Sequence, residues 1–432
     1  MHEMNRRSFM KTTAAVSLGA IASQIGAKAY AAGDDKIRIG LIGCGGRGTG
    51  AARDCIEASE SVELVAMADL FKDRLDSSLK NLKEGTSDKK TAPLSRGFNV
   101  SPDQCFVGFD AYQKLLACKL DMVLLTAPPY ARPMHLKAAV EAGKHVFMEK
   151  PAGVDPAGIR SVIQTAELAD QKKLSIVAGT QRRHQKHYID LMKKVHEGAI
   201  GDLMTAQCYW CGGDMLGYWK WFEREKMAND MEWQCRNWPW FLWTSGDHLV
   251  EQHVHNIDVV NWALDAHPVK AYGMGGRAVR KYGNIYDHFA VEFEYPKGIK
   301  VTSMCRQMPA CTERVSENVK GTKGFCYTDG ATGYIKGENA YRYEGPNPNP
   351  YVEEHVDLIK SIKDGKPLNE AKRVAESTMA GIMGRMSTYT GREISWDWVM
   401  NASKLDIVPA KLDFAGEFPA EPPAAPGKTQ LI

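Results

Sequence analysis

The chain has 432 residues, of which 44% are hydrophobic, so it is long enough to bury two cores and predicts two or three domains. Its formal net charge is +3, and this excess comes from residues 1–31, so the remainder of the chain is neutral. A neutral chain without a basic patch or a basic amphipathic run excludes nucleic acid and a membrane surface as expected partners.

The first 31 residues resemble a twin-arginine export signal. Arg6 and Arg7 precede a short, Ala-rich apolar stretch that ends in small residues. This stretch is too short and too polar for a stable transmembrane helix, and no later stretch of the sequence is long enough to span a bilayer. We therefore expect export of the folded protein to the periplasm without stable membrane insertion. The alternative interpretation is a short first helix.

Ten cysteines in an exported chain ordinarily indicate disulfides, but a protein that folds before export is equally compatible with free buried thiols. The one C-x-x-C pair, Cys208 and Cys211, lies in a predicted strand, where its sulfurs point to opposite faces. We therefore expect neither a metal site nor a redox role for this pair.

The first motif after the signal is a glycine loop. A short apolar strand runs into Gly43-x-Gly45-x-x-Gly48, with Gly46 and Arg47 between the last two of these glycines. The first glycine allows a tight turn, the second lets the backbone approach a pyrophosphate, and the third lets the next helix lie close to the strand. The N-terminus of that helix favours an anion. These residues predict a dinucleotide site.

The next predicted strand, over residues 62–68, is followed by Asp69, about twenty residues after the last glycine, where a carboxylate that binds the ribose is expected. Such a carboxylate repels the 2′-phosphate of NADP, so NAD is favoured, although Lys72 leaves NADP open. A chance acid at this position is the alternative interpretation.

Strands and helices alternate from residue 36 to residue 151, as in a doubly wound, parallel α/β sheet. The turn from Thr126 to Pro129 follows one strand, and the run from Gly143 to Pro151 ends in Glu-Lys-Pro. Together with the glycine loop and Asp69, this succession resembles the Gfo/Idh/MocA family, the glucose-fructose oxidoreductase and inositol dehydrogenase group. The resemblance extends over most of the chain.

The resemblance implies an N-terminal Rossmann domain over residues 34–152 and a C-terminal α+β domain over residues 153–408, with a large, open, mostly antiparallel sheet. Helices over residues 351–391 can pack back on the Rossmann domain, and residues 409–432 are expected to form an irregular tail. The open sheet implies a homo-oligomer. Five further NAD contacts are implied, at Thr126, Pro128, His135, Glu149 and Lys150.

Eight of the ten tryptophans lie between residues 210 and 262. Sugar rings stack on such side chains, but Trp also fills cores and subunit interfaces. We expect most of these tryptophans to be core or interface residues and one or two to contact the substrate, with Trp243 as the candidate.

Residues 246–258 are predicted to form one helix that carries His248, Glu251, His255 and Asp258 on one stripe. The last three match the family pattern of an acid, three residues and a histidine, then an aspartate, except that Glu replaces the usual Asp. Hydride transfer needs a group that takes the hydroxyl proton and a cation that stabilises the alkoxide. We predict Lys150 and His255 in these roles, with Glu251 assisting.

Three further residues, Arg182, His248 and Asp258, are expected to contact the substrate together with Trp243. The alternative for His255 is a satisfied histidine at a domain boundary, and for Lys150 a solvated surface charge. His248, Glu251 and His255 could also offer metal ligands, but they lack the His-Glu-x-x-His spacing of a helical zinc site, so we predict no metal.

These residues predict an exported oxidoreductase that contains NAD and acts on a sugar or sugar derivative by hydride transfer. Because an exported enzyme lacks a cofactor supply, its NAD is expected to be tightly bound and regenerated in place. The first alternative is a redox-neutral glycosidase, which oxidises a hydroxyl, eliminates the glycosidic substituent, adds water and reduces the ketone again. The second is a non-catalytic sugar-binding protein, although Lys150 and His255 are both present.

Overall fold

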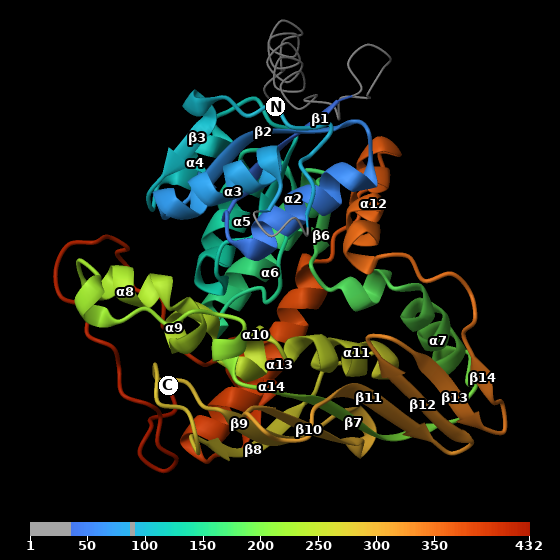
Figure 1. Cartoon of the computed structure of the whole chain (residues 1–432). Coiled ribbons are helices and arrows are strands. Elements are labelled where there is room, and N and C mark those ends of the chain that lie inside the picture. Colours follow the sequence, from blue (N-terminus) through green and yellow to red (C-terminus); the bar gives the residue numbers. More distant parts are fainter. Residues whose placement is uncertain (1–35, 87–90) are drawn as a thin grey trace, which may run out of the picture.

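The computed structural model describes residues 36–86 and 91–432 (Figure 1). The predicted export signal over residues 1–31 lies outside the described residues. Two sheets organise the described part of the chain: one of six strands and one of nine. The predicted fold class, a Rossmann domain joined to an α+β domain with a large open sheet, is confirmed.

The six-stranded sheet is parallel throughout and has the order β3-β2-β1-β4-β5-β6. Its central strands are continuous apolar runs that are buried on both faces, which suits a sheet with helices on either side. Its strands are β1 (Ile37–Ile42), β2 (Val62–Asp69), β3 (Cys105–Val107), β4 (Met122–Leu125), β5 (His145–Met148) and β6 (Ile176–Ala178). Its helices are α2 (Gly46–Ala58), α3 (Lys72–Glu84), α4 (Ala111–Leu116), α5 (Arg132–Glu141) and α6 (Pro156–Gln171).

This sheet extends past residue 152, where the sequence predicted the Rossmann domain to end. α6 and β6 add one more parallel crossover, and β6 pairs with β5. The predicted boundary needs this correction because the Glu-Lys-Pro run follows the fifth strand rather than the last one. β6 is only three residues long, and its pairing with β5 places it in this sheet.

The nine-stranded sheet has the order β14-β13-β12-β11-β7-β10-β9-β8-β15, and only β7 and β10 pair in parallel. One face is buried, while the other exposes Tyr272, Met274 and Met304. Assembly of a homo-oligomer through this exposed face stays a prediction. The strands are β7 (Leu203–Gly212), β8 (Lys270–Gly276), β9 (His288–Glu294), β10 (Lys300–Gln307), β11 (Arg314–Gly321), β12 (Gly324–Asp329), β13 (Gly333–Gly337), β14 (Tyr341–Arg342) and β15 (Ile394–Ser395).

The late helices join the two sheets (Figure 1). Along α12 (Pro350–Lys363), Leu358, Ile359 and Ile362 share one buried cluster with residues of β1 and α2. α13 (Ala371–Thr390) is buried along most of its length and packs between α6 and the nine-stranded sheet. Three shorter helices of the C-terminal domain are α7 (Lys186–His196), α8 (Asp230–Arg236) and α14 (Trp396–Asn401).

Residues 246–258 do not form the single helix that the sequence predicted. α9 (Leu242–Ser245) ends just before this segment, which contains α10 (His248–Glu251) and the beginning of α11 (Val254–Leu264). The buried carboxylate of Asp247 accepts hydrogen bonds from the N–H groups of His248 and Tyr286, which fixes the start of α10. At the break after α10, the N–H of His255 donates to Gln252 O, so the carbonyl of Glu251 has no partner within the helix.

Candidate active site

A cavity of about 1100 Å³ lies at the carboxyl ends of β1, β2, β4 and β5, and α10 and α11 close its other side. Ligands of doubly wound sheets bind at this edge. The cavity brings together all the predicted cofactor and catalytic residues. These are Gly43, Gly45, Gly46, Arg47, Gly48, Asp69, Thr126, Pro128, His135, Glu149, Lys150, Glu251 and His255.

The glycine loop has the close contacts that its motif requires. Gly43 has a φ of +100°, and a Cβ there would lie 2.3 Å from the backbone nitrogen of Ala127. A Cβ on Gly48 would lie 1.9 Å from the carbonyl oxygen of Gly43, so α2 could not lie as close to the strand with any other residue. A Cβ on Gly45 would meet nothing within 4 Å. The second glycine therefore borders open space in the cavity.

The first turn of α2 fits the pyrophosphate of NAD. Its N-cap, Gly45, provides no side-chain hydrogen bond, and the turn contains no acidic residue. The free N–H groups can therefore bind an anion. Beside them, Asp69 accepts hydrogen bonds from the N–H groups of Cys44 (2.6 Å) and Phe71 (2.8 Å). Burial raises the pKa of Asp69, and these two hydrogen bonds oppose that rise.

Arg47 lines the cavity, but three carboxylates hold its guanidinium. It contacts Glu149 and pairs with Asp54 (2.9 Å) and with Glu354 of α12 (3.0 Å). Tyr351 lies under the same guanidinium, with its ring centroid 5.0 Å away. The predicted contact between Arg47 and the cofactor therefore competes with a structural role, because this side chain fastens α12 to the glycine loop.

Lys150 and Glu251 form an ion pair inside the cavity. The Nζ atom of Lys150 donates to the backbone oxygen of Glu251 (2.5 Å) and to its Oε1 (2.9 Å). The first contact exists because the break after α10 leaves that carbonyl without a partner in the helix. Both side chains are about 15% exposed, at 14% and 15%. An ammonium has three donors, so one N–H of Lys150 remains for a ligand.

His255 lies next to this pair, with its ring stacked on Trp210 of β7 at a centroid distance of 5.6 Å. Burial and the nearby charges of Lys150 and Arg182 hold the pKa of His255 well below its usual range. The imidazole is therefore neutral at physiological pH. Its Nδ1 is buried without a hydrogen-bond partner among the described residues.

The four predicted substrate residues, Arg182, His248, Asp258 and Trp243, do not line the cavity. Arg182 pairs with the buried Glu317 (2.6 Å), and the Nε2 atom of His248 bonds to the carbonyl of Trp210 (3.1 Å). Trp243 donates to Gln234 Oε1 (2.7 Å) in an aromatic core cluster. The bonded polar atoms of these residues thus contact other protein groups, and contact of the four residues with a substrate stays a prediction. Four other tryptophans line the cavity, namely Trp210, Trp219, Trp238 and Trp240.

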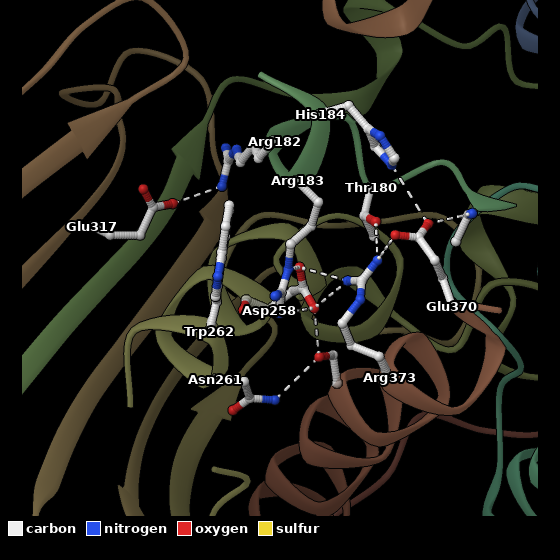
Figure 2. A network of polar contacts seen from close by, with 12 residues as sticks. Thr180, Arg182, Arg183, His184, Asp258, Asn261, Trp262, Glu317, Glu370 and Arg373 are labelled. Atoms are coloured by element: carbon white, nitrogen blue, oxygen red, sulfur yellow. Dashed lines mark hydrogen bonds and ion pairs between the residues drawn. The ribbon is translucent and has the colours of Figure 1, made fainter. Parts of the chain in front are cut away.

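Asp258 belongs to a buried ion-pair network (Figure 2). Its carboxylate accepts from Arg183 (2.7 Å), Arg373 (3.1 Å) and Ser377 (2.8 Å). Burial by itself would raise the pKa of Asp258, but the two guanidinium groups lower it below its usual range. The helical stripe could not reveal this position, because the break after α10 rotates α11 and directs Asp258 to α13 rather than to the cavity.

One cavity residue, Gln252, was missed by the sequence analysis. Gln307 Nε2 donates to Gln252 Oε1 (3.1 Å), and Arg280 Nη2 donates to Gln307 Oε1 (2.5 Å). Since a guanidinium only donates, it orients both amides and leaves Nε2 of Gln252 as a donor at the cavity. The position directly after Glu251 was the only signal in the sequence, because Gln307 and Arg280 are brought close by the fold.

Neither a metal cluster nor a membrane-spanning helix is found in residues 36–86 and 91–432. No group of three or more His, Cys, Asp or Glu side chains there could hold a metal ion. No helix in the same ranges combines the length and the apolar character needed to cross a bilayer.

The glycine loop supports a direct test of the cofactor site. Gly45→Ala is expected to leave the melting temperature unchanged, because its methyl group meets no protein atom within 4 Å. It should weaken NAD binding by about tenfold to a hundredfold, since filling a close contact costs roughly 1–3 kcal/mol. Calorimetric titration with NAD measures this change. Gly330→Ala, in an exposed turn with equal room for a methyl group, is the matched control. Unchanged NAD affinity in Gly45→Ala would place the pyrophosphate elsewhere.

Comparison with known proteins identifies both halves of this arrangement. Residues 37–177 match the model of an oxidoreductase family with an NAD-binding Rossmann fold, and residues 188–326 match the GFO/IDH/MocA C-terminal domain. An inositol 2-dehydrogenase of Azotobacter vinelandii is 25% identical over 266 residues, which are 61% of this chain and 65% of that protein. The match thus spans less than two thirds of that relative. A glycosyl hydrolase family 109 protein of Shewanella baltica is 26% identical over 228 residues, 48% of this chain and 46% of that protein.

Solved structures share the fold at low sequence identity. The aldose-aldose oxidoreductase of Caulobacter crescentus, in complex with glycerol, superposes with a TM-score of 0.63 at 15% identity, over 83% of this chain and 99% of that chain. The scyllo-inositol dehydrogenase of Lactobacillus casei, with bound NAD(H) and scyllo-inositol, gives a TM-score of 0.62 at 18% identity, over 83% and 99%. The predicted NAD-binding domain is confirmed by the family match, and the chain belongs to the Gfo/Idh/MocA family of oxidoreductases.

Proposed function

We propose that this protein is an NAD-dependent oxidoreductase that transfers hydride between the cofactor and a secondary alcohol of a sugar or cyclitol. One observation carries the proposal: the Lys150–Glu251 pair and the neutral His255 share a single cavity with the glycine loop. The relatives named above as inositol and aldose oxidoreductases support this substrate class.

The chain's own residues divide the work of the reaction. The free N–H of Lys150 binds the oxygen of the reacting hydroxyl and stabilises the negative charge that develops there. His255 takes the hydroxyl proton, because its imidazole lines the cavity next to Lys150. Glu251 holds the Lys150 ammonium in place. The glycine loop and Asp69 hold NAD, which supplies the hydride acceptor when bound.

A panel of polyols tests this function directly. Purified protein with NAD is mixed with myo-inositol, scyllo-inositol or D-glucose, and NADH formation is followed by its near-ultraviolet absorbance. We expect NADH to form with at least one ring polyol. A protein that binds both NAD and a polyol, forms no NADH and releases no aglycone from aryl glycosides would be the non-catalytic sugar-binding protein of the second alternative.

A redox-neutral glycosidase is the second candidate function. The similarity to the family 109 glycosyl hydrolase of Shewanella baltica favours it. Bound NAD would accept the hydride of a sugar hydroxyl, and the same Lys150 and His255 would handle its proton. The substituent would then leave by elimination, water would add, and the ketone would be reduced again by the NADH formed. Aryl glycosides incubated without added cofactor distinguish the two functions, since only the glycosidase releases the aglycone.

We also propose that the protein is exported in its folded state and keeps its NAD bound. The support is the Arg6-Arg7 pair and the apolar stretch that follows it. Replacing Arg6 and Arg7 with lysines is expected to retain the protein in the cytoplasm, and cell fractionation measures this. A matched Lys11→Arg variant keeps the arginine pair and should export normally. Export that survives the loss of both arginines would contradict the twin-arginine route.

A further inference from the structure

Two segments from outside the Rossmann domain close the half of the cavity beside Asp69. α8 supplies Arg236 and the C-terminal tail supplies Leu412, and both line the same cavity as the glycine loop. Neither segment is part of the six-stranded sheet. A cofactor that lies along the glycine loop with its ribose at Asp69 would therefore be covered by two separate pieces of chain.

Arg236 contacts the Rossmann domain at Phe71 and Asp73, two residues that closely follow β2. Its guanidinium carbon lies 4.0 Å from the ring centroid of Phe71, and its Nη1 lies 3.1 and 3.2 Å from the two carboxylate oxygens of Asp73. Glu232, one turn earlier in α8, accepts from Nε at 2.8 Å and orients the side chain. The Arg236 side chain is only 16% exposed. The Arg236 guanidinium is therefore partly desolvated and is held against the Phe71 ring by these contacts.

The C-terminal tail contacts the same residue, Phe71, although it lies far from α8 in the sequence. The ring of Phe414 stacks on Phe71 at 6.1 Å and approaches Phe109 to 4.9 Å. Gln234 of α8 donates to the carbonyl of Phe418 (2.7 Å), so α8 and the tail also hold each other. Phe71 is therefore contacted by both segments, and its own N–H holds Asp69.

We infer that Arg236, Leu412 and Phe414 form a clasp that keeps NAD bound between turnovers. The inference rests on the proposed function, because it concerns the cofactor of that site. Arg236 and Leu412 line the cavity beside Asp69, so a dinucleotide bound there lies against them. The contacts of Phe71 with Arg236 and Phe414 hold the two segments in place and slow dissociation. Such a clasp suits a protein that carries its NAD through many turnovers and regenerates it in place.

The dissociation rate of NADH tests the clasp without any substrate. Full-length protein is loaded with NADH and mixed with a large excess of NAD, and the fluorescence of bound NADH is followed as it decays. We expect Arg236→Gln to release NADH about tenfold faster than the wild type, which corresponds to about 1.4 kcal/mol. Phe414→Ala, which leaves the ion pair intact, should also release NADH faster.

The matched control is Arg224→Gln. Arg224 precedes α8 and pairs with Asp230 within the same segment, so its loss leaves the Rossmann contact intact and the release rate unchanged. Salt gives a second readout: release from the wild type should accelerate as the Arg236–Asp73 pair is screened, while release from Arg236→Gln should not. Melting curves of each variant show whether it is folded.

The outcomes separate this inference from the proposed function. If folded Arg236→Gln and Phe414→Ala release NADH at the same rate as the wild type, the clasp is overturned. A wild-type protein with no affinity for NAD or NADH would instead contradict the proposed function itself.

Discussion

Lys150→Met is expected to lower the rate of alcohol oxidation by about 10²–10⁴-fold, the range that a positioned acid or base contributes. The substitution removes the cation that binds the reacting oxygen and leaves the Glu251 carboxylate without its partner at 2.9 Å. His255→Ala should give a loss of the same order, because it removes the imidazole that takes the hydroxyl proton in the proposed reaction. Conversion of bound NAD to NADH in a single turnover with a polyol measures both losses.

The binding of NAD separates a chemical effect from a structural one. His255→Ala should bind NAD with an affinity within a few-fold of the wild type, because the glycine loop and Asp69 are untouched. Lys150→Met also removes an expected NAD contact, so its rate is measured at saturating NAD. Lys137→Met, on the exposed side of α5, serves as the matched lysine control and should retain full activity. Full activity in His255→Ala would show that this residue has no part in the mechanism. Full activity in Lys150→Met would show the same for the Lys150–Glu251 ion pair.

Asp258→Ala is expected to lower the free energy of unfolding by about 3–5 kcal/mol, the cost of breaking a buried ion pair on one side only. The Asp258 side chain is 2% exposed, and its loss leaves the guanidinium groups of Arg183 and Arg373 facing each other without their shared carboxylate. Urea unfolding with a constant m value measures the change. Glu197→Ala breaks an exposed ion pair with Lys193 and should change stability little.

The same network predicts how stability depends on pH. The folded-state pKa of Asp258 is lowered, so its contribution to stability is present above its unfolded pKa of about 3.9 and is lost as the pH falls below it. His184 acts in the opposite sense. Burial lowers its pKa, but hydrogen bonds to Asp357 and Glu370 raise it to about 9. Its contribution is therefore complete below its unfolded pKa of about 6.5 and is lost as the pH rises to about 9.

Catalysis gives the complementary readout for Asp258. If Asp258 is structural, the variant that remains folded should keep its Michaelis constant for the polyol. A folded Asp258→Ala protein with normal stability and a greatly raised Michaelis constant would restore the substrate role that the helical stripe suggested. The geometry in Figure 2 predicts the first result.

The cofactor half of the site could be predicted from sequence because its signals are local. Gly48 packs on the carbonyl of Gly43 five residues earlier, and Asp69 stands at the end of the next strand, so both leave a recognisable spacing. Gly43 meets Ala127 from a distant part of the chain, but its positive φ belongs to the turn itself and marks the same motif. Lys150 was found for a similar reason, because its position at the end of a strand places it at the crevice.

The substrate half depends on tertiary contacts that no spacing records. The predicted single helix is interrupted on both sides of α10. α10 begins where the buried Asp247 binds Tyr286 and Tyr389, residues that lie far away in the sequence, and it ends at Glu251, before α11 begins at Val254. The second interruption frees the carbonyl of Glu251 for Lys150 and turns Asp258 away from the cavity. Gln252 and Arg236 were missed for the same reason, since their partners come from other parts of the chain.

The NAD content of the purified protein tests the central claim most directly. Full-length protein isolated without added nucleotide is denatured, the released nucleotide is quantified by mass spectrometry, and the emptied protein after refolding is titrated with NAD. The account predicts that NAD or NADH is released in a ratio of about one per chain, as for one site per Rossmann domain. An empty site that also fails to bind added NAD would contradict it.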